Sequence, residues 1–264
     1  MPTPVRNGPG ASPWRWAVWG SMTGLLLAAV LFAPARWLAA WVHGASLGQV
    51  SLADARGSVW TGSSQMLLSG GAGSQGSVAL PGRLSWHLRP NLSGFNLQVV
   101  APCCMAQALQ LSTRLGLSGL VIAVADHASN WPAGLLAGLG TPWNTIAAEG
   151  NLAVSSRGLS VEWSQGRVSL LGGLQIDAQD MASRLTTFNP VGSYRLMLAG
   201  GPLVSLKVQT LKGSLQLNGA GQWVGGRLRF EGVASAAPER LDALSNLLNI
   251  IGRREGERSI IKVG

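Results

Sequence analysis

Few side chains in this sequence have the type and spacing that acid–base or nucleophilic chemistry requires. Its three histidines, His43, His87 and His127, are far apart, and none has a second histidine at i, i+4 spacing. A zinc site is therefore not predicted, because zinc needs several nitrogen or sulfur ligands held together. Asp126 precedes His127, but no serine or cysteine nucleophile in a recognisable motif accompanies this acid–imidazole pair. We expect a surface pair here and not a catalytic dyad.

The cysteines and the paired aspartates offer no stronger chemistry. Cys103 and Cys104 are adjacent and cannot join distant segments of the chain. A disulfide between neighbours is uncommon given normal disulfide geometry, so we expect two small, half-buried residues, with their redox state left open. Asp177 and Asp180 have too few oxygen ligands around them for a calcium loop, and we expect them to cap a turn. The sequence predicts no catalytic residue, metal or cofactor, and a protein that is not an enzyme.

The composition indicates short strands and turns together with one apolar segment. Charged residues make up 12% of the 264 residues, about half the usual share for a soluble domain, and 36 residues are glycine. The net charge of +9 comes from basic residues scattered singly, apart from Arg253-Arg254. No basic run follows the pattern of a phosphate-binding surface, so we expect no nucleic-acid partner.

An uncharged apolar segment near the N-terminus has the features of a membrane anchor, which would hold the rest of the chain at a membrane. It runs WAVWGSMTGLLLAAVLFA over residues 16–33, and its 18 residues reach the lower end of the length that spans a bilayer. Tryptophans lie at both ends, as at membrane–water interfaces. We expect a transmembrane anchor over residues 14–43, preceded by a disordered cytoplasmic leader over residues 1–13. The anchor residues expected to contact lipid are Trp16, Trp19, Leu25, Leu26, Leu27, Val30, Leu31 and Phe32.

A cleaved signal peptide is the alternative interpretation of this segment. Arg6 and Arg15 would supply its positive region, and Ala33 or Ala39-Ala40 its cleavage site. The apolar stretch is longer than a usual signal core and tryptophan flanks both ends, which favours an uncleaved signal anchor. Because the Pro/Gly-rich leader cannot fold, we expect it to stay in the cytoplasm and the rest of the chain to be exported.

After a connector over residues 44–56, apolar residues recur with a period of two, which is typical of strands with one buried face. In GRLSWHLRP, for example, Leu84, Trp86 and Leu88 alternate with polar residues, and similar runs ending at glycine continue to the C-terminus. This pattern predicts a mainly β domain over residues 57–264. We expect a curved antiparallel meander, or a partly open barrel or half-shell.

Two stretches interrupt the strand pattern. A short helix is expected over residues 132–139, with Asn130 as its N-cap. Leucines and isoleucines at helical spacing between Pro238 and Gly252 predict a C-terminal helix, and a final strand is expected over residues 259–263.

Tryptophans bounded by glycine recur through the predicted strands, as in GSVWTG at residues 57–62. Glycine permits tight turns, and one tryptophan on an inward face covers a large area. We expect most of these tryptophans to be core residues. They are also the candidates for an apolar face or interface: Trp60, Trp86, Trp131, Trp143, Trp163 and Trp223.

The order of these motifs resembles the type II secretion system protein N family. The resemblance rests on the N-terminal span, W-L-A-A-W, G-S-V-W-T-G-S, G-x-L-S-W-x-L-R-P and a terminal L-L-x-x-x-G-R segment, and it covers the chain from about residue 16 onward. It implies a single-pass inner-membrane protein of a Gram-negative bacterium, with its C-terminal domain in the periplasm. It also implies an accessory part in moving folded proteins across the outer membrane, with other secretion proteins as partners and no known catalytic residues.

Two further expectations concern what the β domain binds. The V-W-x-G and W-x-L patterns also resemble envelope proteins of the AsmA type, which implies a lipid-binding or lipid-transfer module as the alternative function. For docking of a secretion protein, we expect strand addition at an exposed edge, at residues 260–263 or near Val59-Trp60.

Overall fold

The computed structural model describes the whole chain except residues 1–12, 72–73, 75, 117–118 and 165. The leader expected over residues 1–13 lies outside the described residues, apart from Pro13, at which the first helix begins.

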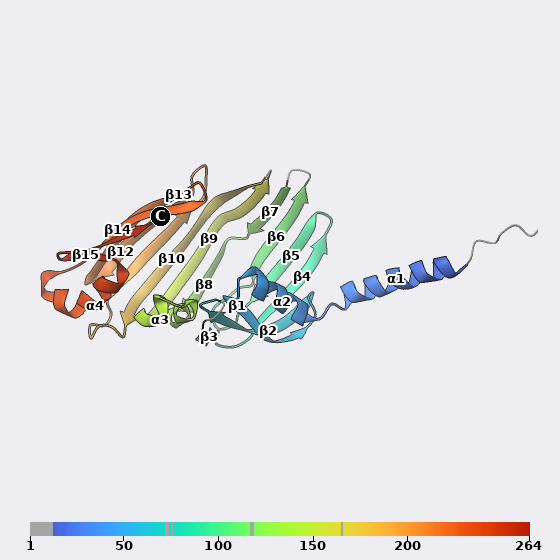
Figure 1. Ribbon diagram of the computed structural model, residues 1–264, viewed down its shortest axis with the longest axis horizontal. Helices are drawn as coiled ribbons and strands as arrows, with labels where there is room; N and C mark the ends of the chain where they lie inside the picture. The colour runs from blue at the N-terminus through green and yellow to red at the C-terminus, as the bar shows by residue number, and fades with distance from the viewer. Residues whose placement is uncertain (1–12, 72–73, 75, 117–118, 165) are drawn as a thin grey trace, which may run out of the picture.

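A single antiparallel sheet of 16 strands forms most of the structure (Figure 1). Fourteen of them follow one another across the sheet almost in chain order, which confirms the expected meander. These strands are, in spatial order, β1 (Val50–Gly57), β2 (Thr61–Ser69), β4 (Leu84–Asn91), β5 (Gly94–Val100), β6 (Leu109–Gly116), β7 (Gly119–Val124), β9 (Ala148–Ser164), β10 (Arg167–Ser183), β11 (Gly192–Ala199), β12 (Ser205–Gly213), β13 (Leu215–Val224), β14 (Arg227–Ala236), β16 (Arg258–Val263) and β15 (Arg253–Glu255). Two short strands pair at the side, β3 (Ser77–Ala79) with β2 and β8 (His127–Pro132) with β9. In the described structure β1 and β15 end the sheet without pairing with each other, so it is open.

The alternating sequence produces alternating burial along the strands. In β13, every second residue from Leu215 to Trp223 is buried or half-buried, and the residues between them are exposed. Tight hairpins join several of the neighbouring strands, and Gly166 and Gly225 adopt φ values of 75° and 61° in two of them. Glycine reaches this left-handed region without steric cost, which explains the glycines at these two turns.

Helices lie at one end of the strands, except for the first. Figure 1 shows α2 (Ala35–Ala45), α3 (Trp143–Ile146) and α4 (Leu241–Ile251) along that end, and α1 (Pro13–Leu31) extending away from the sheet. The segment expected as one anchor is thus divided in two, because Pro34 lacks the N–H that would continue the helix. Of the helices in the described part of the chain, none reaches the combination of length and hydropathy that a bilayer crossing demands.

Two hydrophobic clusters form the core at this helix-bearing end. In the first, Leu244, Leu247 and Leu248 of α4 pack with Tyr194 and Leu215 of the sheet. This confirms the C-terminal helix, which follows a 3₁₀ turn, η2 (Pro238–Arg240), and ends before Gly252. The second cluster contains Leu80, Ala101, Cys104 and Leu135.

Two expected elements have the expected bounds to within one residue but differ in detail. The short helix is a 3₁₀ helix, η1 (Ala133–Leu139), and its N-cap is Pro132. Asn130 cannot cap it, because it lies in β8, where it pairs with Ala153 of β9. The final strand exists as β16, but it lies between β14 and β15 over part of its length, so it is not a simple edge.

Candidate interaction surface

One face of the sheet is apolar across its whole middle. Residues paired in register share a face, and Leu88, Leu97, Leu111 and Val124 form one such row over β4, β5, β6 and β7. A second row crosses β10, β11 and β12 with Ile176, Leu196 and Val208. The residues between them on each strand, such as Gln98, Gln110 and Lys207, point to the opposite, polar face.

The apolar face, which we call the inner face, is less exposed than the polar face even where no helix covers it. In β12, Leu206 and Val208 are half-buried whereas Lys207 and Gln209 are exposed, although no helix of the described structure packs on this part of the strand. Apolar side chains on adjacent strands bury one another on the inner face, whereas the long polar side chains on the opposite face extend into water.

Four apolar side chains, three of them exposed, form a row at the hairpin ends opposite the helices. Leu115, Leu120, Trp163 and Val168 lie in register on β6, β7, β9 and β10, and we call them the apolar row. Trp163 is 57% exposed, and Leu115 and Val168 are each 61% exposed. A contiguous exposed apolar patch that contains tryptophan is typical of a binding surface.

Three of the other candidate tryptophans are structural. Trp86 is only 2% exposed and donates its indole N–H to the Val59 carbonyl at 3.0 Å. Trp60 is half-buried and donates to the Val30 carbonyl at 2.8 Å. Trp131 packs against the second cluster and donates to Ser129 Oγ at 2.9 Å.

The last two candidates lie apart from the apolar row. Trp223 is half-buried on the inner face of β13, and Trp143 is partly exposed at the start of α3. The structure therefore does not gather the six tryptophans into one site, and only Trp163 belongs to the apolar row. The sequence pattern did not distinguish it, because burial depends on which end of the sheet the helices cover.

The two tryptophan motifs meet across neighbouring strands. Gly62 of GSVWTG pairs with Trp86 of GRLSWHLRP, and a Cβ at position 62 would overlap the Trp86 ring and lie 2.7 Å from the Arg56 carbonyl. The first strand, β1, does lie at an edge of the sheet as expected, but it ends at Gly57, and Val59 and Trp60 form the turn between β1 and β2.

An ion-pair group beside this turn was not expected from the sequence. Arg83 Nη1 lies 2.7 Å from Asp54 Oδ2, and Arg83 Nη2 donates to the Asp54 carbonyl at 2.7 Å. Hydrogen bonds from Arg83 and then Arg56 lower the pKa of Asp54. Asp54 has a φ of 48° at an irregularity in β1, so Arg83 holds this irregular backbone against β2 and β4.

Asp177 and Asp180 lie within β10 and do not cap a turn as expected. Asp177 forms a bidentate pair with Arg195 of β11, with two N–O distances of 2.7 Å. Hydrogen bonding from Arg195 lowers the pKa of Asp177, although burial of the carboxylate acts in the opposite direction and raises it. Asp180 lies at a register shift and pairs with Lys212 at 2.9 Å. Both aspartates therefore link strands.

The other candidates for chemistry are also structural. Asp126 Oδ1 accepts the Gly158 N–H at 2.7 Å, and His127 is half-buried in β8. Cys103 and Cys104, whose redox state the sequence left open, are joined as a vicinal disulfide in a turn where the Cys104 N–H donates to the Ala101 carbonyl. Cys103 is exposed and Cys104 buried, so neither is half-buried as expected. In the part of the chain that the structure describes, no three His, Cys, Asp or Glu side chains gather as metal ligands would.

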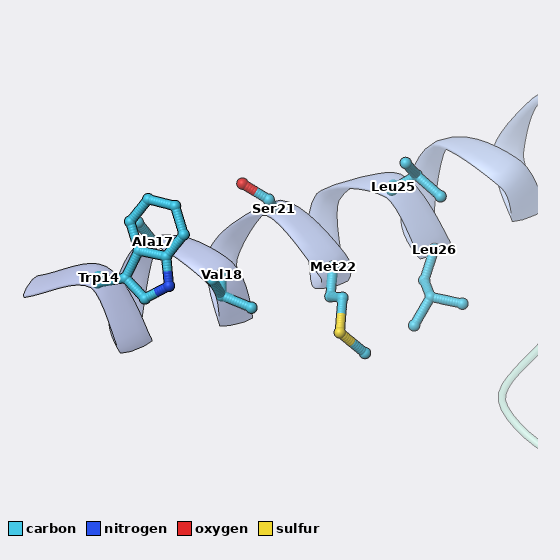
Figure 2. Close-up of a pocket in the computed structure, with 7 residues that line it drawn as sticks. All are labelled: Trp14, Ala17, Val18, Ser21, Met22, Leu25 and Leu26. Carbon is cyan, nitrogen blue, oxygen red and sulfur yellow. The ribbon is translucent and has the colours of Figure 1, made fainter.

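The expected anchor residues all lie exposed on α1 and just after it. Figure 2 shows side chains along one side of α1, where a shallow hollow of about 540 Å³ is lined by Trp14, Ala17, Val18, Ser21, Met22, Leu25 and Leu26. No other element contributes to this hollow. The apolar surface of α1 is thus left without a protein partner in the described structure.

Comparison with known families gives one match. The model of the family described as "Type II secretion system (T2SS), protein N" matches residues 48–261, which is most of the chain and includes nearly the whole sheet. Neither a curated protein nor a solved structure matches the chain significantly.

Proposed function

Since the chain belongs to the type II secretion system protein N family, we propose that its β domain docks another secretion protein through the apolar row. The family makes the chain an accessory component of this secretion system and associates it with the cell envelope. Family membership does not say which surface of the protein binds a partner, and we assign this role to the apolar row.

The exposure of Trp163 and its neighbours is the observation that supports docking. Burying a tryptophan with two or three aliphatic side chains at the centre of an interface supplies the type of contact that dominates binding energy. Strand addition is the weaker route, because β15 has three residues, all charged, and β1 carries a register shift. Short, charged or irregular edges resist the addition of a further strand.

The proposal includes anchoring in the inner membrane by α1, with the β domain in the periplasm, although α1 by itself falls short of the combined length and hydropathy of a bilayer crossing. Its 19 residues extend about 28 Å at about 1.5 Å per residue, close to the thickness of a bilayer core of about 30 Å. The exposed apolar side chains around α1 support insertion, since water would not stabilise such a surface. The role is that of a binding component and not of an enzyme.

Site-specific photocrosslinking in secreting cells tests the docking proposal. A benzophenone amino acid replaces Trp163 on the apolar row, and in a matched control it replaces Glu162, which faces the other side of the same strand. We expect a protein adduct, identified by mass spectrometry as a secretion component, from position 163 and not from position 162. Equal adducts from both positions, or none from either, would contradict docking by this row.

A phospholipid adduct at position 163 would instead favour the second candidate function, lipid binding on the inner face. The observation behind that candidate is the apolar face itself, which continues from β4 to β14 beyond the helices. Acyl chains make no hydrogen bonds and bind through apolar contacts, which the side chains of this face provide.

A further inference from the structure

The second helix carries two apolar stripes, and only one of them packs on the protein. Ala35, Leu38, Ala39 and Val42 are buried or half-buried on the side where α2 contacts β1. The opposite side exposes Trp37 and Trp41, 53% and 69% exposed, together with Ala40 between them. Because residues at i, i+3 and i+4 share a helix face, these three form one outward stripe.

A hydrogen-bonded elbow fixes where α2 lies relative to α1. The Val30 carbonyl would accept the N–H of residue 34 in a continuous helix, but Pro34 has none. The indole N–H of Trp60 takes this place at 2.8 Å. The neighbouring Val59 N–H donates to the Ala33 carbonyl, also at 2.8 Å, and Trp86 in turn holds the Val59 carbonyl. The GSVWTG turn therefore joins the end of α1 to the sheet.

The short separation of the two helices limits what can cover the outward stripe. Three residues, 32–34, lie between α1 and α2, and they extend no more than about 11 Å at up to about 3.6 Å per residue. The interfacial region on each side of a bilayer core is about 5–8 Å thick. If α1 is inserted, α2 therefore starts in or beside the headgroup region.

The chemistry of the stripe matches a lipid surface better than a protein surface. Tryptophans favour the membrane interface, where the ring lies in an apolar layer and the N–H reaches polar groups. Helix α2 contains Arg36 and no acidic residue, which suits anionic headgroups. Leu47, which follows the helix and is 79% exposed, adds to the exposed apolar surface.

We propose that α2 lies along the membrane surface, with Trp37 and Trp41 among the lipid headgroups beside the point where α1 enters. This inference rests on the proposed insertion of α1. In this arrangement the GSVWTG turn has a structural role, because Trp60 and Val59 hold α1, α2 and the first hairpin of the sheet in fixed positions.

Fluorescence quenching in vesicles tests this placement. The full chain is reconstituted into phosphatidylethanolamine/phosphatidylglycerol vesicles with brominated acyl chains, after single substitutions that carry an environment-sensitive thiol label. The labelled positions are Trp41→Cys on the stripe, Leu26→Cys on α1 and Gln98→Cys on the polar face of the sheet. Labelling without reductant leaves the Cys103–Cys104 pair unreactive, and the unsubstituted chain is the blank.

The three positions separate this inference from the proposed function. We expect strong quenching at position 26, intermediate quenching with a blue-shifted spectrum at position 41, and none at position 98. Quenching at 26 with a water-exposed spectrum at 41 would overturn the placement of α2 while leaving the α1 anchor intact. Absence of quenching at both 26 and 41 would overturn the anchor as well.

Discussion

The tryptophans of this protein have different surroundings and therefore different roles. Trp60 and Trp86 both donate to backbone carbonyls, at Val30 and Val59, and so connect α1, the first hairpin and β4. Trp163, in contrast, lies more than half exposed on the apolar row. One residue type thus serves as a helix cap, as core and as a candidate contact.

Removing the N–H of Trp60 while keeping most of its ring tests its role as a cap. We expect Trp60→Phe to loosen the joint between α1 and the sheet, because the Val30 carbonyl then keeps only the longer hydrogen bond from the Ala33 N–H, at 3.4 Å. Distances between spin labels at Leu26 and Gln98 should broaden, with a loss of stability of about 1 kcal/mol. Trp143→Phe is the control, since this partly exposed ring lies far from the joint; equal distance distributions in both variants would refute the cap.

Packing at Gly62 gives a second prediction for a single residue. Gly62→Ala should lower the free energy of unfolding by about 1–3 kcal/mol, because the new methyl group overlaps Trp86 and the carbonyls of Arg56 and Ser58. Denaturant unfolding of the detergent-solubilised chain measures the effect. Gly134→Ala is the matched control, because its Cβ meets nothing within 4 Å, and an equal loss there would show that the contact at Gly62 is unimportant.

The Asp177–Arg195 pair makes stability depend on pH. Because Arg195 holds the pKa of Asp177 below its ordinary value of 3.8, the pair stabilises the fold above that pH. This contribution is lost as pH falls through the lowered pKa of the folded state. Asp177→Asn should therefore lower the free energy of unfolding by about 1–3 kcal/mol at pH 7 and by much less near pH 2, as measured by denaturant unfolding. A loss that does not change with pH would contradict the ionic origin.

Among the elements, α4 is the one that closes the C-terminal end of the sheet. Leu244 and Leu248 are fully buried, and Ser259 of β16 donates its hydroxyl to the Leu248 carbonyl at 2.7 Å. The last strand is therefore part of the core, and deleting residues 257–264 would unfold this end instead of only removing an edge. A deletion thus cannot test docking here.

A substitution within α4 tests how far this end depends on the helix. Leu248→Ala should destabilise the protein by about 2–5 kcal/mol, because it leaves a cavity between α4 and the sheet. Ile250→Ala on the exposed side of the same helix is the control and should cost less than about 1 kcal/mol. Thermal unfolding followed by circular dichroism compares the two, and similar losses would contradict the packing described.

For the whole molecule, local patterns predicted the architecture but not the sites. The two-residue period and the glycine turns gave the antiparallel meander, and helical spacing between Pro238 and Gly252 gave α4, because both signals are local. The break at Pro34 was visible in the sequence, but its consequence depends on Trp60, which comes 26 residues later. Pairs such as Asp54–Arg83 likewise depend on register, which a single strand does not reveal.

The most direct test of the account is secretion by cells that carry a changed apolar row. The double variant Trp163→Ser/Val168→Ser removes two paired side chains of the row, and Glu162→Gln/Ser169→Ala changes the pair on the opposite face of the same hairpin. We expect the first variant to weaken docking by roughly 10–30-fold and to reduce export of the secreted proteins at unchanged protein level and melting temperature. The control should secrete normally. Normal secretion by both variants would contradict the claim that this surface joins the protein to the secretion system.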